Sequence, residues 1–153
     1  MKESATCLAD IMTRTVSSIE PDSTLEEAYQ KMLGAGIHHL VVMKAGRVAG
    51  VLSERDVHRA RGTGYASGDD AWTVEEVMSG RVVVAAPETT AREAAVMLRG
   101  HAIGCLPVMD GKQLVGIVTT SDLLDLLAQA KLHGRLPVEP IEEELDEEAR
   151  VTH

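Results

Sequence analysis

The chain has 153 residues, which is the length of about one domain. Its 15 Lys and Arg and 24 Asp and Glu give a formal net charge of −9, and 44% of its residues are hydrophobic. Proteins that wrap duplex nucleic acid concentrate positive charge on one face, and proteins that bind single strands stack bases on aromatic rings. This chain is acidic and only 2% aromatic, so we expect no polymeric nucleic-acid partner.

The N-terminal residues contain no apolar run of signal-peptide length, and no stretch approaches the length of a membrane span. The two cysteines, Cys7 and Cys105, lie far apart without metal-ligand spacing. Disulfides are rare in proteins that carry no export signal. We therefore expect a cytoplasmic protein with reduced thiols and no membrane partner.

The chain contains two copies of one unit. When residues 8–59 are aligned without a gap to residues 74–125, 13 of the 52 pairs are identical. The identical pairs include Met12 and Met78, Gly50 and Gly116, and Asp56 and Asp122. Identities at turn, core and acidic positions are hard to obtain from composition alone, so the sequence indicates an internal duplication.

The duplication divides the chain into four segments. We predict repeat 1 at residues 8–61, a glycine-rich linker at 62–73, repeat 2 at 74–132 and an acidic, disordered tail at 137–153. A repeat of about 60 residues exposes a sheet face that it cannot bury alone. The two repeats should therefore pack sheet to sheet about a pseudo-two-fold axis, and any site in the cleft between them should occur twice.

Each repeat is predicted to form a strand, a helix, two strands and a second helix, which is an α+β or α/β fold. The first strand of repeat 1 is the β-rich run Val16–Ile19. Capping-box patterns at Ser23 and Thr24 open the first helix, and Gly34 and Gly36 end it. Apolar residues recur at helical spacing between these signals, which predicts one buried helical face.

A hairpin and a second helix complete each repeat. The remaining elements of repeat 1 are strands at Leu40–Met43 and Val48–Leu52, a turn at Ala45-Gly46 and a helix from Ser53 to about Arg61. Repeat 2 is predicted to follow the same order. Its hairpin turn lies at Asp110-Gly111, and its last helix runs from about Thr120 to about Leu132.

Both copies carry the pattern Gly-apolar-apolar-hydroxyl-x-x-Asp, at residues 50–56 and 116–122. A hydroxyl at a helix N-terminus lies beside unpaired backbone N–H groups, where phosphate binds readily. An ionised aspartate one turn later can accept hydrogen bonds from the two hydroxyls of a ribose, and the glycine would let backbone approach a ligand. The alternative is that each hydroxyl and aspartate form a helix cap alone, because the spacing is close to a capping box.

The doubled unit, with these two motifs and with residues 103–108 before the second hairpin, resembles a tandem pair of CBS domains, the Bateman module, over about residues 8–130. The resemblance implies two CBS repeats that bind AMP, ADP, ATP or S-adenosylmethionine in the cleft between them, with no required cofactor. It also implies a homodimer that regulates a separate partner protein. The Leu-Pro-Val signature of the family is intact at residues 106–108, whereas repeat 1 reads Leu-Val-Val at residues 40–42.

Carried over residue by residue, the resemblance implies two nucleotide-binding pockets, each built from both repeats. One pocket would contain Ser53 and Asp56 together with Arg81, Val82 and Val83, and the other Thr119 and Asp122 together with Thr15, Val16 and Ser17.

The residues that follow the two motifs differ in charge. In repeat 1, Arg55, His58 and Arg59 fall on one helical face. The equivalent residues of repeat 2 are Ser121, Leu124 and Asp125. Because phosphate favours cationic donors, the Asp56 pocket is the better candidate for a charged nucleotide, and the alternative is a solvated helix face.

His38 and His39 precede the first hairpin, where some members of the family place basic residues that contact phosphates. The alternatives are plain surface histidines and a metal site. We expect no metal, because a ligand pair on a helix needs i, i+4 spacing and other ligands nearby.

No nucleophile elbow, P-loop or paired-cysteine motif is present, and we assign no catalytic residue and expect no enzyme. The leading hypothesis is a sensor in which an adenosyl ligand bridges the two repeats and biases their packing. The alternative is an oligomeric scaffold or interaction module whose clefts are degenerate. A small enzyme is the third hypothesis.

Overall fold

The computed structural model describes residues 5–63 and 71–130. In chain order the elements are α1 (Leu8–Ile11), β1 (Ser18–Ile19), α2 (Leu25–Ala35), β2 (His39–Lys44), β3 (Arg47–Ser53), α3 (Glu54–Gly62), α4 (Val74–Val77), α5 (Ala91–His101), β4 (Cys105–Asp110), β5 (Gln113–Thr119) and α6 (Thr120–Gln129). The predicted tail, most of the linker and the predicted end of the last helix lie outside the described residues.

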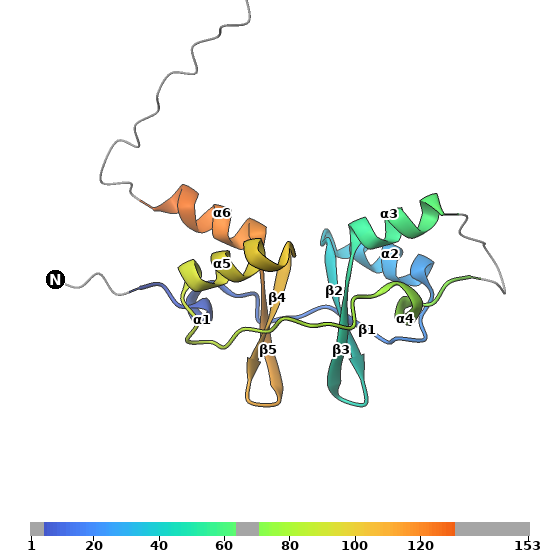
Figure 1. The fold of residues 1–153 in the computed structure, drawn as a ribbon, viewed down its shortest axis with the longest axis horizontal. Coiled ribbons are helices and arrows are strands. Elements are labelled where there is room, and N and C mark those ends of the chain that lie inside the picture. The colour runs from blue at the N-terminus through green and yellow to red at the C-terminus, as the bar shows by residue number, and fades with distance from the viewer. Residues whose placement is uncertain (1–4, 64–70, 131–153) are drawn as a thin grey trace, which may run out of the picture.

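The two repeats lie side by side (Figure 1). One half holds the hairpin β2–β3 with helices α2 and α3, and the other holds the hairpin β4–β5 with helices α5 and α6. Strands and helices are mixed in both halves, and the strands form two separate sheets. The predicted mixed fold with two related repeats is therefore confirmed.

Local sequence signals set the ends of the helices. Thr24 caps α2 because its hydroxyl oxygen accepts a hydrogen bond from the Glu27 amide at 3.1 Å, and the Glu27 carboxylate accepts one from the Thr24 amide at 2.8 Å. Gly36 ends the helix in the left-handed region, with φ of 64°. The equivalent pair, Thr90 and Glu93, caps α5 in the same way.

The two hairpin turns have the same length but different backbone conformations. Ala45 and Gly46 both have positive φ in the first hairpin. In the second hairpin the loop residues are Gly111 and Lys112, and among them only Gly111 has positive φ. The turn therefore lies one residue later than the predicted Asp110-Gly111, because glycine occupies its first central position rather than its second.

The first strand is the main difference between the two repeats. In repeat 1, β1 pairs in parallel with β2, and the Val41 amide donates a hydrogen bond to the Ser17 carbonyl at 3.2 Å. The residue equivalent to Val41 is Pro107, which has no amide hydrogen to donate. The pairing in repeat 2 therefore shrinks to a single bridge at Ala85, and the strand predicted there is absent from the described residues. In repeat 1 the strand is also shorter than the predicted Val16–Ile19.

Each repeat begins with a four-residue helix that packs on the other repeat. Leu8 of α1 is fully buried among Leu98, Leu106 and other core residues of repeat 2, and its amide donates to the Thr89 carbonyl at 2.8 Å. Val74 of α4 is fully buried in the core of repeat 1. The repeats seen in sequence and the cores formed by packing therefore differ by an exchange of α1 and α4.

A third cluster of apolar residues joins the two sheets. Its fully or largely buried members are Val41, Cys105 and Ile117, and Val16, Met43, Val48, Val51 and Leu114 pack around them. These residues come from both hairpins and from the segment before β1. The predicted sheet-to-sheet packing is confirmed by this cluster.

The two motif glycines are where the exchanged segments cross the hairpins. A Cβ at Gly50 would lie 2.6 Å from the Met78 sulfur and 2.8 Å from the Ser79 carbonyl oxygen, and one at Gly116 would lie 2.6 Å from the Met12 sulfur. The space beside each glycine is therefore filled by the other repeat. The sequence suggests that these glycines let the backbone approach a ligand; in the structure, each lets the crossing segment of the other repeat approach the hairpin.

We expect Gly50→Ala to lower the free energy of unfolding by about 1–3 kcal/mol, because the added methyl overlaps Met78 and the Ser79 backbone. Urea unfolding followed by circular dichroism measures this loss. The matched control is Gly34→Ala in α2, where no atom lies within 4 Å of the new Cβ. Alanine there should stabilise the protein by roughly 0.4–1 kcal/mol. Equal effects at the two positions would show that the crossing does not depend on glycine.

Candidate functional site

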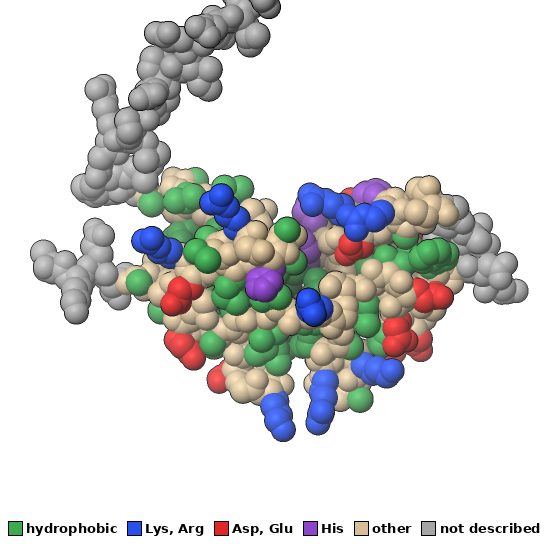
Figure 2. Space-filling view, in the orientation of Figure 1, with side chains coloured by type: hydrophobic (Ala, Val, Ile, Leu, Met, Phe, Trp, Pro, Cys, Tyr) green, Lys and Arg blue, Asp and Glu red, His purple; other side chains and the backbone are tan. Residues whose placement is uncertain are grey.

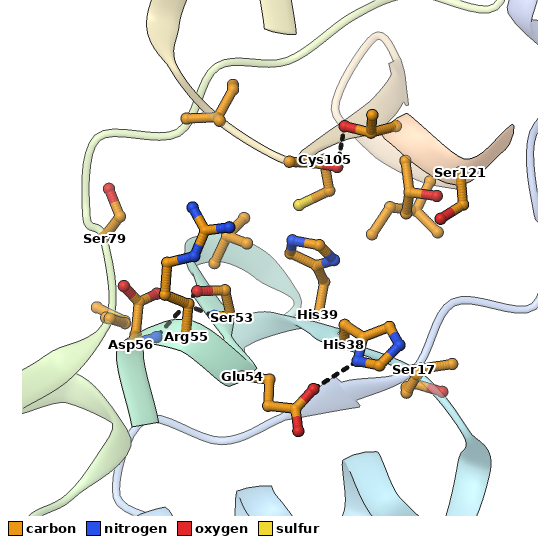
Figure 3. Close-up of a pocket in the computed structure, with 18 of the residues that line it drawn as sticks. Ser17, His38, His39, Ser53, Glu54, Arg55, Asp56, Ser79, Cys105 and Ser121 are labelled. Atoms are coloured by element: carbon orange, nitrogen blue, oxygen red, sulfur yellow. Dashed lines mark hydrogen bonds and ion pairs between the residues drawn. The ribbon is translucent and has the colours of Figure 1, made fainter. Parts of the chain in front are cut away.

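A cavity of about 1260 Å³ lies between the two repeats. Its walls are the N-terminal turns of α3 and α6, the loops before β2 and β4, and the two crossing segments at 13–17 and 77–83 (Figure 3). Thirteen of the fourteen predicted site residues line this cavity. They are Thr15, Ser17, His38, His39, Ser53, Arg55, Asp56, Arg81, Val82, Val83, Thr119, Ser121 and Asp122.

Val16 is the one predicted site residue that does not line the cavity. It packs instead in the cluster that joins the two sheets. Successive side chains of an extended segment point to opposite sides, so Thr15 and Ser17 face the cavity while Val16 faces the core.

Ser53 and Asp56 form a complete capping box at the start of α3. The Ser53 hydroxyl oxygen accepts a hydrogen bond from the Asp56 amide at 3.1 Å, and Asp56 Oδ2 accepts one from the Ser53 amide at 2.9 Å. The other carboxylate oxygen, Oδ1, lies 3.9 Å from a guanidinium nitrogen of Arg59, whose side chain is 71% exposed. Asp56 therefore caps its helix with one oxygen and has the other near the guanidinium of Arg59.

Thr119 and Asp122 form a similar cap at the start of α6, but here the hydroxyl donates to the carboxylate. Asp122 Oδ2 accepts a hydrogen bond from the Thr119 amide at 2.8 Å and another from the Thr119 hydroxyl at 3.2 Å. Within the described residues, Oδ1 of Asp122 has no hydrogen-bond partner. The hydrogen bonds of a helix cap are present in both motifs, and each cap uses only one carboxylate oxygen, Oδ2.

The two adjacent histidines have different surroundings. His38 Nδ1 lies 2.5 Å from Glu54 Oε2, and His58 Nε2 lies 3.4 Å from Glu54 Oε1. The hydrogen bond from His38 lowers the pKa of Glu54. Figure 3 shows His38 turned toward Glu54, whereas His39 points into the cavity between Arg55 and Cys105. In the part of the chain that the structure describes, no group of three His, Cys, Asp or Glu side chains is arranged to hold a metal ion.

His39 and Cys105 lie at the centre of the cavity. Burial lowers the pKa of His39, and the nearby His38 and Arg55 lower it further, while Asp56 opposes them. Burial also raises the pKa of the Cys105 thiol to about 12, and the Asp56 carboxylate adds to this effect. The thiol is therefore protonated at neutral pH, and Cys105 packs as a small apolar residue instead of acting as a nucleophile.

Several cavity residues were not predicted from the sequence. Ser79, Glu54, Gly104 and Cys105 line the cavity but were not predicted to bind a ligand. The alignment of the repeats contains a signal for Ser79, because a hydroxyl residue follows the identical methionine in both copies. Glu54 carries no such signal, since its histidine partners are assembled only by the fold.

We expect His39 to make stability depend on pH below its ordinary pKa of 6.5. The unfolded chain takes up the His39 proton at a higher pH than the folded chain, so stability falls as the pH drops from 6.5 through the folded pKa. His39→Gln should remove this part of the loss. Urea unfolding at several values between about pH 7.5 and pH 5 measures the slope.

The control for this prediction is His101→Gln, which removes an exposed histidine at the end of α5, outside the cavity. That variant should keep the wild-type slope. A His39→Gln slope identical to that of the wild type would contradict the prediction.

Comparison with known proteins gives one family. The model described as CBS domain matches residues 8–62 and again residues 74–129. The CBS domain-containing protein YhcV of Bacillus subtilis is 36% identical over 115 residues, which cover 74% of this chain and 80% of that protein.

Solved structures with the same fold are also CBS pairs. A signal-transduction protein with CBS domains from Burkholderia ambifaria is 27% identical with a TM-score of 0.77, and the match covers 86% of this chain and 99% of that one. The CBS domain pair of protein MJ0100, in complex with 5′-methylthioadenosine and S-adenosyl-L-methionine, is 24% identical with a TM-score of 0.74. That match covers 82% of this chain and 98% of the other.

Enzymes also match, but only over a small part of their length. Homoserine O-acetyltransferase of Methanohalophilus mahii is 30% identical over 118 residues, which are 76% of this chain and 23% of the enzyme. These matches involve the CBS region of this chain and only a small part of each larger enzyme. None of the described helices is long and apolar enough to cross a membrane.

Proposed function

Since the chain belongs to the CBS domain family, we propose that it is a regulatory module that binds an adenosyl ligand in the cleft between its two repeats. CBS domain pairs are generally regulatory rather than catalytic. The single observation that carries the proposal is the pair of helix N-termini facing one cavity, each with a hydroxyl and an aspartate that uses only one of its oxygens for the helix cap. A helix N-terminus attracts phosphate, and a free carboxylate oxygen accepts ribose hydroxyls.

The ligand class follows from the chemistry of the cavity. Val82, Val83, Ile37 and Ile103 offer aliphatic contacts for a base, and no aromatic residue is among those that line the cavity. The polar groups gather at the starts of α3 and α6, where the ribose and its substituent would lie. The candidates are AMP, ADP, ATP and S-adenosylmethionine. The complex of the MJ0100 pair is the reason to include 5′-methylthioadenosine among the test compounds.

Regulation would act through the packing of the two repeats. The residues of each half-site come from both repeats, so a bound ligand has different affinities for arrangements in which the repeats lie closer or further apart. The proposal includes a separate regulated protein and a cytoplasmic location. It also includes a homodimer, because no residue of α6 is buried and Leu124 and Leu127 are each 60% exposed.

A scaffold with degenerate clefts is the second candidate. The observation in its favour is that both aspartates already act as helix caps, so the capping role alone accounts for their presence. Ligand-dependent stabilisation separates the two candidates.

We expect at least one adenosyl compound to raise the thermal midpoint. A ligand present at a hundred times its Kd adds about 2.7 kcal/mol to the free energy of unfolding, which corresponds to roughly 5–10 °C for a chain of this size. The measurement is a thermal-shift panel with AMP, ADP, ATP, S-adenosylmethionine, 5′-methylthioadenosine and NAD near millimolar concentration. No shift with any of them, in protein shown to be free of co-purified ligand, would favour the scaffold.

We expect Asp56→Asn to weaken ligand binding at its half-site by roughly tenfold or more while the protein stays folded. Asparagine keeps an oxygen that can cap the Ser53 amide, but it loses the charge that favours the ribose hydroxyls. Isothermal titration calorimetry with the compound that gives the largest shift measures the change.

The matched control is Glu93→Ala. Glu93 closes an equivalent capping box with Thr90 on α5, and it does not line the cavity. Removing it should lower stability by about 0.5–2 kcal/mol and leave ligand affinity unchanged. If Glu93→Ala weakens binding as much as Asp56→Asn does, the effect of Asp56 comes from stability and not from contact with the ligand.

A further inference from the structure

We propose that the two halves of the cleft bind different classes of adenosyl compound. The half around Asp56 binds a compound that carries phosphate, and the half around Asp122 binds one without phosphate. This inference rests on the proposed function and adds to it the charge class of each ligand.

Cations are distributed unequally between the two halves of the cavity. The three Arg and Lys side chains among the residues that line it are Arg55, Arg59 and Arg81. Arg55 and Arg59 belong to the first turns of α3, which also carry Asp56. Arg81 lies on the crossing segment equivalent to residues 13–17. At the positions that the duplication pairs with these arginines stand Ser121, Asp125 and Thr15. The two halves of the cavity are therefore similar in fold but differ in charge.

Two of these arginines have no anionic partner within residues 5–63 and 71–130. Among the described residues, Arg55 and Arg81 form no ion pair, and Arg59 makes only a long, exposed contact with Asp56. Glu54, the other acid near the start of α3, is hydrogen bonded to His38 and points away from Arg55 (Figure 3). A guanidinium free of carboxylates can bind phosphate with two parallel hydrogen bonds.

Arg55 lies at an electrostatically unfavourable position within its helix. Arg55 is the second residue of α3, where the helix dipole is positive and disfavours a cation. A bound phosphate would reverse this penalty, because it brings negative charge to the helix N-terminus and to the guanidinium together. The equivalent position of α6 holds the neutral Ser121.

His39 adds a fourth polar group to the same half. Asp56 and Arg55 both act on the pKa of His39, which places the ring within electrostatic reach of both. Figure 2 shows Lys, Arg and His side chains gathered over the start of α3, beside the groove between the repeats. A phosphate in this half would meet guanidinium groups and the imidazole ring of His39.

The Asp122 half offers a different environment. Its polar side chains near the start of α6 are neutral hydroxyls, with Asp122 as the charged group. Thr119 donates to Asp122, and the Thr120 hydroxyl donates to the Gly104 carbonyl at 3.4 Å. A phosphate there would face a carboxylate with no cation beside it. An uncharged thioether or a positively charged sulfonium on the adenosyl group fits this half better.

The test is isothermal titration calorimetry on the full chain with ATP and 5′-methylthioadenosine as probes. The wild type should bind one ATP per chain, and protein saturated with ATP should still bind 5′-methylthioadenosine. Arg55→Ser and Arg81→Thr install the residues of the other half, and each should weaken ATP binding by roughly tenfold or more. The affinity of either variant for 5′-methylthioadenosine should stay within about twofold of the wild type.

Two further variants sharpen the test. Arg99→Ser on α5 removes an exposed arginine outside the cavity and should leave ATP affinity unchanged, which controls for the loss of net positive charge. Thr15→Arg places a cation in the Asp122 half and should create a second, weaker ATP site. Thermal unfolding without ligand checks that each variant is folded.

Three outcomes would contradict the proposal that the two halves bind different ligands. Two ATP molecules per wild-type chain, with Asp56→Asn and Asp122→Asn each removing one, would overturn the charge inequality and leave the proposed function standing. If Arg81→Thr and Arg55→Ser weaken the binding of ATP and of 5′-methylthioadenosine equally, the charge inequality is also overturned and the proposed function still stands. Binding of neither probe, nor of any other adenosyl compound, would overturn the proposed function and this inference together.

Discussion

Each repeat completes its hydrophobic core with a residue from the other repeat. Leu8 of repeat 1 packs in the core of repeat 2, and Val74 of repeat 2 packs in the core of repeat 1, each on a helix of only four residues. Both side chains are fully buried, and each helix is tied to its host by backbone hydrogen bonds. The segments that lead back from these helices must pass close over the hairpins, which is possible because Gly50 and Gly116 have no side chain. The cavity between the repeats is lined by those same segments, so the exchange of helices also builds the site.

The two aspartates show how one group can serve structure and binding at once. Each uses one carboxylate oxygen to cap its helix, as Glu27 and Glu93 do on the outer helices. What differs is location, because the caps of α3 and α6 face a cavity and those of α2 and α5 do not. Capping also holds the carboxylate in a fixed position, which lowers the entropy lost when a ligand binds.

Much of this fold could be predicted from the sequence, because duplication doubled each local signal. The helix caps and the strands of both hairpins lie where the pattern places them, and thirteen of the fourteen predicted site residues line the cavity. The failures come from long-range effects. The helices α1 and α4 are too short to show periodicity and are fixed by packing on the other repeat. The first strand of repeat 2 is lost because Pro107 cannot donate the pairing hydrogen bond. The side chain of Val16 faces the core because the two sheets pack together there.

The exchange of α1 and α4 bears on how such a chain could arise. A protein with a single repeat would have an unfilled core and a loose leading helix, and two copies would satisfy each other by swapping those helices. Joining the two copies end to end converts this swapped dimer into one molecule and replaces a bimolecular association with a tethered one. Once fused, the halves no longer have to stay identical. The arginines on one side and the hydroxyls on the other are differences that a symmetric ancestor with one coding sequence could not have carried.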